Sequence, residues 1–214
     1  MTHVKDLKAH FKSQVVFTLR DAKIYLKGRK LGKNYLNLLI HGLIKKGELH
    51  KITQGTYSFQ TDPTLYGFAF SPFYYGLQNA LALHNMGTQE TNPVIVTPRK
   101  VRLGLRTIEN THFIIHRIQR PMFFGYDFVR YYDWEIPVSD LEKTFIDMVY
   151  FKQPLTEEVL NELKPKLDGK KIQEYLKRYP KNMQKQVNQK LGTGLGIAKH
   201  FTKGFERDRK ARDF

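Results

Sequence analysis

The sequence predicts an α+β fold with two parts, residues 1–62 and residues 63–214. Three observations support this prediction. Apolar residues recur at helical spacing in three successive segments near the N-terminus. Residues 93–97 form a continuous apolar run typical of a buried strand, and three stretches between residues 103 and 131 alternate as strands do. Beyond residue 150 the helical spacing returns and the chain becomes strongly basic. A chain of 214 residues, 41% of them hydrophobic, is long enough for one large or two small domains.

The first two N-terminal helices are predicted from an apolar face and from a cap. Val4, Leu7 and Phe11 give the first helix an apolar face. Thr18 is a residue type that favours the N-cap position, and it precedes a second helix expected over residues 19–26.

The third N-terminal helix has the clearest pattern in the chain. Its apolar residues follow the i, i+3, i+4, i+7, i+8 spacing of one buried helix face: Leu36, Leu39, Ile40, Leu43 and Ile44. Polar and basic residues occupy the other face and the turns that flank the helix: Lys30, Lys33, Asn34, Tyr35, Asn37, His41, Lys45 and Lys46. Long polar side chains on one helix face are what the recognition of bases in a major groove requires.

A short hairpin is predicted after this helix, over residues 49–52 and 55–59, with Lys51 at its basic tip. Three helices followed by such a hairpin are the elements of a winged helix-turn-helix, so residues 1–62 are predicted to bind double-stranded DNA. The alternative is a three-helix protein-interaction module whose basic face is only solvated.

The DNA-binding interpretation assigns a role to each polar residue of this surface. The asparagines and the histidine of the third helix, Asn34, Asn37 and His41, would contact base edges, and Tyr35 would lie against the sugar-phosphate backbone. The lysines would hold phosphates: Lys30, Lys33, Lys45, Lys46 and Lys51.

Positive charge is concentrated at the two ends of the chain, whose formal net charge is +16. Residues 1–62 hold 12 Lys and Arg against 4 Asp and Glu, residues 63–150 hold 8 of each, and residues 151–214 hold 16 against 8. Two basic ends predict two surfaces that meet phosphate. The second surface would consist of Lys164, Lys170, Lys171, Lys177, Arg178, Lys181 and Lys185. Because RNA-binding proteins are also basic, an RNA-binding or RNA-processing factor is the alternative function.

The second part is predicted to combine a small antiparallel sheet with helices and to end in a helical, basic C-terminal region. Strand-like stretches follow one another at residues 93–97, 103–108, 112–118 and 123–131. Ser71-Pro72 predicts the start of a helix over residues 73–86 that stops at Gly87. A capping box from Ser139 to Glu142 predicts another helix, and further helices are expected at residues 156–163, 168–179 and 182–191.

Aromatic residues are dense in this second part. The period-two positions Phe124, Tyr126 and Phe128 predict burial against one face of the sheet. The alternative is an exposed surface on which the bases of single-stranded nucleic acid stack.

No catalytic, metal or cofactor site is predicted, so the chain is not expected to be an enzyme. His112 and His116 share one face of a predicted strand without the further ligands that a metal site requires. Three acids near a strand end would suit a metal nuclease or, equally, a solvated edge: Asp127, Asp133 and Glu135. The glycines at 192, 194 and 196 lack the spacing of a phosphate-binding loop and indicate a hinge.

Composition also bears on the compartment. The chain has no cysteine, which excludes disulfides and cysteine-ligated zinc. No stretch approaches the run of about 20 apolar residues that a membrane helix requires, and the N-terminus lacks the apolar core of a secretory signal. A cytoplasmic protein without a membrane partner is therefore expected.

Several segments between residues 15 and 150 resemble the AbiEi antitoxin family, in the same order along the chain. These segments are residues 17–22, 43–49, 52–57, 75–86, 94–97 and 137–148. The resemblance implies a transcriptional regulator that is the antitoxin of a type IV toxin–antitoxin pair and that represses its own operon by binding inverted repeats. It places DNA binding in residues 1–59 and associates toxin neutralisation with the C-terminal region. The toxin would be a nucleotidyltransferase-like protein that the antitoxin counters without forming a stable complex.

Overall fold

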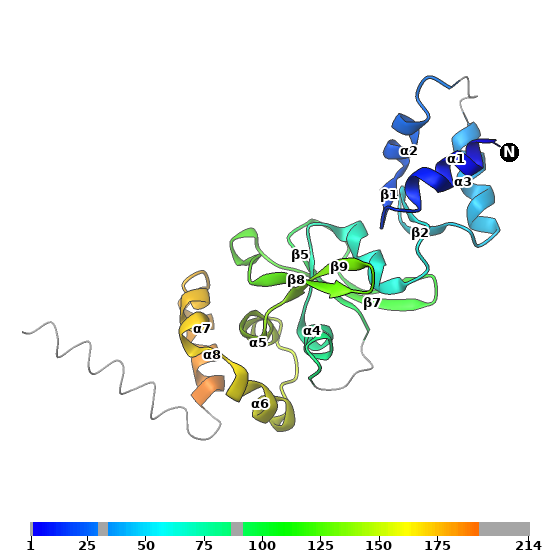
Figure 1. Cartoon of the computed structure of the whole chain (residues 1–214). Coiled ribbons are helices and arrows are strands. Elements are labelled where there is room, and N and C mark those ends of the chain that lie inside the picture. The colour runs from blue at the N-terminus through cyan, green and yellow to red at the C-terminus, as the bar shows by residue number, and fades with distance from the viewer. Residues whose placement is uncertain (1, 30–33, 87–91, 193–214) are drawn as a thin grey trace, which may run out of the picture. The chain divides into compact units, whose positions relative to one another are not determined.

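The structure of the protein is a computed structural model that describes residues 2–29, 34–86 and 92–192 (Figure 1). The chain divides into two compact units. Unit 1 comprises Met1–Tyr75, Thr91–Phe123 and Phe128–Pro137, and unit 2 comprises Gly76–Glu90, Phe124–Asp127 and Val138–Phe214. Both units are therefore built from segments that lie far apart in the sequence.

Unit 1 begins with helices and a small antiparallel sheet. The helices are α1 (Thr2–Phe11), α2 (Leu19–Tyr25) and α3 (Tyr35–Lys45), and the strands are β1 (Phe17–Thr18), β2 (His50–Thr53) and β3 (Thr56–Ser58). The strands pair in the order β1-β3-β2, so Tyr57 of β3 lies between Phe17 and Lys51. The predicted helices and hairpin are present, and β1 adds a third strand to the hairpin.

The local sequence explains where α2 begins and why the three helices pack together. The side chain of Thr18 accepts a hydrogen bond from the Asp21 N–H at 3.2 Å, and the Asp21 carboxylate accepts one from the Thr18 N–H at 2.8 Å. This capping box confirms Thr18 as the N-cap. One apolar cluster joins all three helices to the sheet: Leu7, Phe11, Phe17, Ala22, Leu26, Leu39, Ile40, Leu43, Leu49 and Tyr57. Full burial of one large apolar side chain of this kind stabilises the fold by about 1.5–3 kcal/mol.

A second sheet has six strands within the described residues. They are β4 (Tyr74–Tyr75), β5 (Val94–Thr97), β6 (Gly104–Ile108), β7 (Thr111–Arg117), β8 (Tyr126–Tyr131) and β9 (Trp134–Ser139), in the order β6-β7-β5-β4-β9-β8. The sequence predicted a small antiparallel sheet, but this sheet is mixed, because β5 runs parallel to β7 while β6 runs antiparallel to it. All four residues of β5 are buried, as is typical of a parallel strand inside a sheet.

The helix predicted over residues 73–86 begins later than expected, at Leu77. Pro63–Phe70 forms a 3-10 helix, the Ser71–Pro72 peptide bond is cis, and Tyr74 and Tyr75 form β4 instead of a first helical turn. Pairing of β4 with β5 overrides the local helical pattern, because it leaves both tyrosine side chains with no exposed surface.

The end of this helix is also earlier than predicted. Helix α4 spans Leu77–Leu83, and His84 caps it. The ring of His84 lies 2.8 Å, Nε2 to O, from the carbonyl of Ser139, so this histidine is a hydrogen-bonded structural residue. Gly87, predicted to stop the helix, lies outside the described residues.

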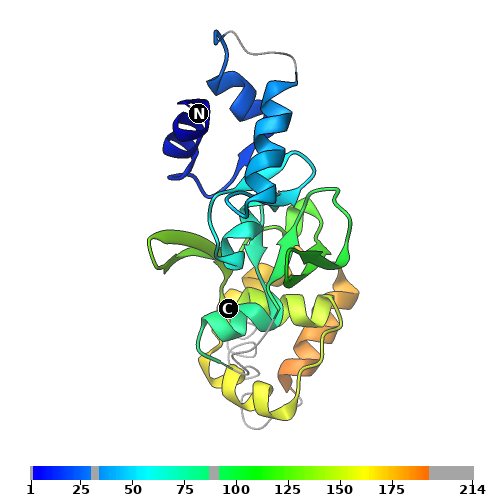
Figure 2. The same cartoon turned by 90° about the vertical axis from the view of Figure 1, so that its right-hand side faces the viewer.

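Unit 2 is mainly helical. After α4 it contains α5 (Leu141–Tyr150), α6 (Glu157–Leu163), the short 3-10 helix Lys164–Lys166, α7 (Gly169–Leu176) and α8 (Lys181–Gly192) (Figure 2). Thr156 and Asp168 are the N-caps of α6 and α7. The predicted C-terminal helices are thus present up to Gly192, and the remaining glycines of the predicted hinge lie in the part of the chain that is not described.

The capping box predicted from Ser139 to Glu142 is wrong by one residue. The N-cap of α5 is Asp140, whose carboxylate accepts a hydrogen bond from the Lys143 N–H at 2.7 Å. Ser139 instead shares a hydrogen bond of 2.7 Å with the hydroxyl of Thr144. The Glu142 carboxylate accepts the Asp168 N–H at 2.9 Å, so it joins α5 to the start of α7.

Candidate nucleic-acid interface

Helix α3 has one buried face and one polar, exposed face. Leu39, Ile40 and Leu43 are buried in the apolar cluster. The polar residues, which recur every three or four positions, are exposed: Asn34, Asn37, His41 and Lys45. An 11-residue helix is about 16 Å long, so these side chains form a row along nearly its whole length.

The residues of this face differ in how exposed their side chains are and in the contacts that they make. Asn34 is the N-cap of α3, yet its side chain makes no capping hydrogen bond. Tyr35 is half-buried, because its ring packs on the apolar cluster and meets the ring of His3 edge-on at 5.8 Å. Leu38, with 70% of its surface exposed, follows Asn37 and adds an apolar side chain to the exposed surface of the helix, which the sequence did not predict.

Three of the predicted phosphate-binding lysines lie at the C-terminal end of α3 or on the hairpin that follows it. Lys45 ends α3, Lys46 caps it, and Lys51 lies on β2, and all three are exposed. Lys30 and Lys33 lie outside the described residues. The nearby acid, Glu48, forms an ion pair with Lys8 of α1.

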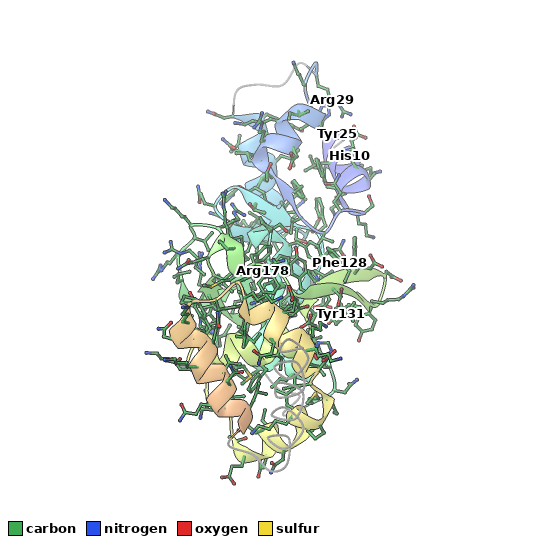
Figure 3. The ribbon with its side chains drawn as sticks, turned by 90° about the vertical axis from the view of Figure 1, so that its left-hand side faces the viewer. His10, Tyr25, Arg29, Phe128, Tyr131 and Arg178 are labelled. Atoms are coloured by element: carbon green, nitrogen blue, oxygen red, sulfur yellow. The ribbon has the colours of Figure 1, made fainter. Side chains whose placement is uncertain are left out.

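A cluster of aromatic and charged residues holds α1 against α2 (Figure 3). The ring of His10 stacks on that of Tyr25 at 4.0 Å. Arg29 forms an ion pair with Asp6 and lies 5.4 Å from the Tyr25 ring centre. These contacts join residues of α1 to residues at and beyond the end of α2, so no spacing within a single helix or strand predicts them.

The hairpin after α3 is also joined to the larger sheet within unit 1. The Nδ1 atom of His50 on β2 lies 3.1 Å from the carboxylate of Glu109, in the turn between β6 and β7. The His50 ring lies 5.9 Å from that of Tyr66. Burial, together with the charges of Glu109 and Asp62, raises the pKa of Tyr66 to about 12.

The second predicted basic surface is interrupted by contacts within unit 2. Lys164 is buried. Lys171 pairs with Asp140 and Glu142 at 3.2 and 3.0 Å, and Lys177 pairs with Glu174. Arg178, labelled in Figure 3, lies 4.3 Å from the ring centre of Phe124. The remaining members of the set are exposed: Lys170, Lys181 and Lys185.

A buried ion pair in unit 2 was not expected from the sequence. Lys143 and Asp147 pair with each other, and neither side chain has exposed surface. The Tyr179 hydroxyl donates a hydrogen bond of 3.3 Å to Asp147, and the ring of Phe124 lies 5.5 Å from the Lys143 ammonium group. Burial lowers the pKa of Lys143, and the Asp147 carboxylate acts in the opposite direction. The pair is therefore part of the core of this unit.

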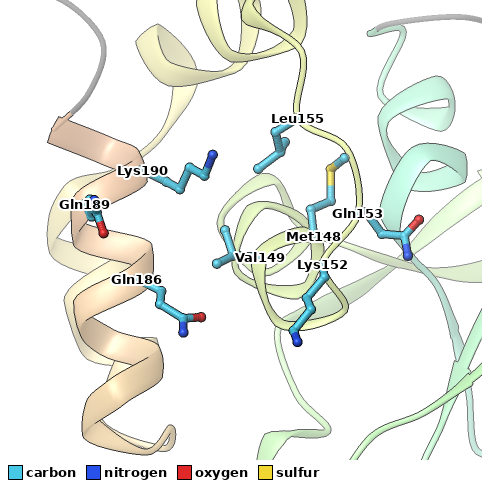
Figure 4. Close-up of a pocket in the computed structure, with 8 residues that line it drawn as sticks. All are labelled: Met148, Val149, Lys152, Gln153, Leu155, Gln186, Gln189 and Lys190. Atoms are coloured by element: carbon cyan, nitrogen blue, oxygen red, sulfur yellow. The ribbon is translucent and has the colours of Figure 1, made fainter.

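A groove lies between α8 and the end of α5 (Figure 4). Its volume is about 410 Å³, and its lining combines apolar, amide and ammonium groups: Met148, Val149, Lys152, Gln153, Leu155, Gln186, Gln189 and Lys190.

The metal sites considered from the sequence do not assemble in the described part of the chain, where no group of three or more His, Cys, Asp or Glu residues is placed to hold an ion. His112 lies 3.0 Å, Nδ1 to Oγ1, from Thr107 on the neighbouring strand. The three acids near the strand end, Asp127, Asp133 and Glu135, are exposed. Among the same described residues, no helix has the length and hydropathy needed to cross a bilayer.

No family model matches the sequence, and no curated protein matches it. The fold is similar to the crystal structure of the RV2827C protein from Mycobacterium tuberculosis, with a TM-score of 0.61. The two chains are 16% identical, and the similarity covers 92% of this chain and 79% of that chain. At this identity the comparison supports the fold alone.

Proposed function

We propose that the protein is a DNA-binding transcriptional regulator and that residues 1–62 are its winged helix-turn-helix. The observation that carries this proposal is the exposed row of Asn34, Asn37, His41 and Lys45 on a helix whose opposite face is buried. An α-helix fits the major groove, which is about 12 Å wide, and amide side chains there can form paired hydrogen bonds with adenine.

The contacts around α3 support this orientation. Lys46 caps α3 and Lys51 lies on β2, and with α3 in the groove these lysines would contact the DNA backbone. Glu48 is the acid closest to these lysines in sequence. Its carboxylate pairs with Lys8, and this pairing lowers the pKa of Glu48. In the proposed winged helix-turn-helix, the hairpin β2–β3 is the wing.

We further propose that the protein represses its own operon and is the antitoxin of a type IV toxin–antitoxin pair. The support is the ordered resemblance of six segments between residues 15 and 150 to the AbiEi family. The cognate toxin would be nucleotidyltransferase-like and would form no stable complex with this protein. We expect a gene of that class to lie beside this one. We also expect the full chain to rescue cells that express the toxin. If the full chain does not rescue these cells, the antitoxin role is excluded, whereas the role as a regulator is not.

The test of DNA recognition compares the full chain with Asn37→Ala and His41→Ala. Fluorescence anisotropy is measured on a duplex from upstream of the gene, on a random duplex and on double-stranded RNA of the same sequence. Each variant should lose about 1–3 kcal/mol of discrimination between the two DNA duplexes. Asn161→Ala, at an exposed asparagine of α6, is the matched control and should leave discrimination unchanged.

Two outcomes would contradict the proposal. Equal binding of specific and random DNA by the unmodified chain would argue against a regulator. RNA binding that is tighter than DNA binding and indifferent to Asn37→Ala would favour the RNA-binding alternative.

A further inference from the structure

The hairpin formed by β8 and β9 carries exposed aromatic side chains, among them Phe128 (Figure 3). Phe128 has 63% of its surface exposed and Tyr132 has 78%. Tyr132 also adopts a positive φ of 52°, a conformation that is costly for a bulky residue and that Gly or Asn adopts more easily. An exposed aromatic ring held in such a turn indicates a surface that contacts a partner.

The charges of the hairpin decide between nucleic acid and protein as that partner. Arg130 is exposed on β8, but three exposed carboxylates belong to the same stretch of sequence: Asp127, Asp133 and Glu135. This local excess of negative charge lies in a chain of net charge +16. Stacked bases would bring phosphates towards carboxylates, which is unfavourable. Exposed aromatic rings and arginine without lysine are, by contrast, typical of protein interfaces.

The position of β8 indicates how a protein partner would bind. It is the last strand of the six-stranded sheet, so one side of its backbone has no strand partner among the described residues. An edge strand of this kind is a template for pairing with another chain. Phe128 and Arg130 lie two residues apart and therefore on the same face of the strand.

We propose that β8 pairs antiparallel with β8 of a second copy of this chain, about a two-fold axis that passes through Val129. In this register Phe128 lies opposite the partner's Arg130, and Arg130 lies opposite the partner's Phe128. Each guanidinium group then meets an aromatic ring across the interface. An axis through Arg130 would set two guanidinium groups against each other. An axis through Phe128 would set the two Phe128 rings against each other and leave Arg130 opposite the half-buried Tyr126 instead of the exposed Phe128.

The proposed dimer is independent of the proposed DNA-binding function, because it uses β8 rather than α3. One added strand pair buries less surface than a standard interface of about 1,600 Å², so the dimer is expected to be reversible and dependent on concentration. Two identical subunits related by such an axis would also have the symmetry of an inverted-repeat site.

The first experiment measures the self-association of the full chain by sedimentation equilibrium. Phe128→Arg should weaken the dimer at least about tenfold, because it replaces two favourable pairs with two repulsive ones. The double variant Phe128→Arg with Arg130→Glu should restore it by reversing the pairing. Leu105→Arg is the matched control, since Leu105 is also 63% exposed and lies on β6 at the opposite edge.

The second experiment uses the absence of cysteine from the sequence. Val129→Cys should form a disulfide-linked dimer on mild oxidation, because directly opposite Cα atoms in an antiparallel pair lie about 4.5–5.5 Å apart, within disulfide range. Leu105→Cys should not. Circular dichroism of each variant checks that the fold is retained.

Three results would overturn the proposal. The unmodified chain could remain monomeric at every concentration, Leu105→Arg could weaken association as much as Phe128→Arg, or the double variant could fail to restore the dimer. A monomer that binds labelled single-stranded oligonucleotide, with affinity lost in Phe128→Arg, would assign the hairpin to nucleic acid instead.

Discussion

Lys143 and Asp147 form an ion pair whose two side chains have no exposed surface. Their spacing of four residues is that of an ordinary surface pair on a helix, and Lys166 with Glu162 provides that case in the same unit, with side chains 50% and 43% exposed. Two pairs with the same spacing thus lie in very different environments.

The buried pair predicts a large cost for removing one partner. Lys143→Met leaves a buried carboxylate, and the free energy of unfolding should fall by about 3–5 kcal/mol. Replacing both residues with apolar ones should cost less than either single change, because no charge is left behind. Urea denaturation of the two single variants and the double variant measures this.

The exposed pair is the control for this experiment. Lys166→Met should change the free energy of unfolding by only about 0.3–0.5 kcal/mol. Similar losses at Lys143 and Lys166 would show that Lys143 is not buried in solution.

The lysines that flank α3 predict the salt dependence of DNA binding. If Lys45, Lys46 and Lys51 each hold a phosphate, replacing one with alanine should lower the slope of log affinity against log salt concentration by about 1. The loss should be the same for specific and random duplexes, because phosphate contacts carry no sequence information. Lys166→Ala, at an exposed lysine that pairs with Glu162 and belongs to neither predicted phosphate surface, should leave the slope unchanged.

Gly125 predicts a steric effect that can be separated from backbone strain. It has a φ of 70°, and a Cβ atom there would lie 2.9 Å from the Tyr175 ring and 3.0 Å from Lys143 Cβ. Gly104 has a φ of 85° with nothing within 4 Å of such a Cβ. Gly104→Ala should therefore show the conformational cost alone, about 1 kcal/mol. Gly125→Ala should cost more, and equal melting temperatures for the two variants would contradict the clash.

The N-terminal elements were predictable because their signals are local. The spacing of Leu36, Leu39 and Leu43 depends only on helical geometry, and Thr18 with Asp21 forms a cap within four residues. The polar face of α3 follows from the same periodicity, so its exposed residues could be named from the sequence.

The remaining features depend on partners distant in sequence. Tyr74 and Tyr75 form a strand because β5 lies beside them, which no local pattern records. Phe128 was predicted to be buried by its period-two spacing, but 63% of its surface is exposed, because the pattern does not reveal that β8 is an edge strand. The parallel pairing of β5 with β7 likewise requires knowledge of topology.

The shortest strand of the larger sheet lies near its middle. Strand β4 has only two residues, and it separates the β6-β7-β5 side from the β9-β8 side. Side-chain contacts stabilise this short strand: the ring of Tyr74 stacks on that of Phe123 at 5.4 Å, and the Tyr75 hydroxyl donates a hydrogen bond to the Thr64 carbonyl. The two sides of the sheet are therefore linked by the packing of aromatic side chains as well as by a strand of only two residues.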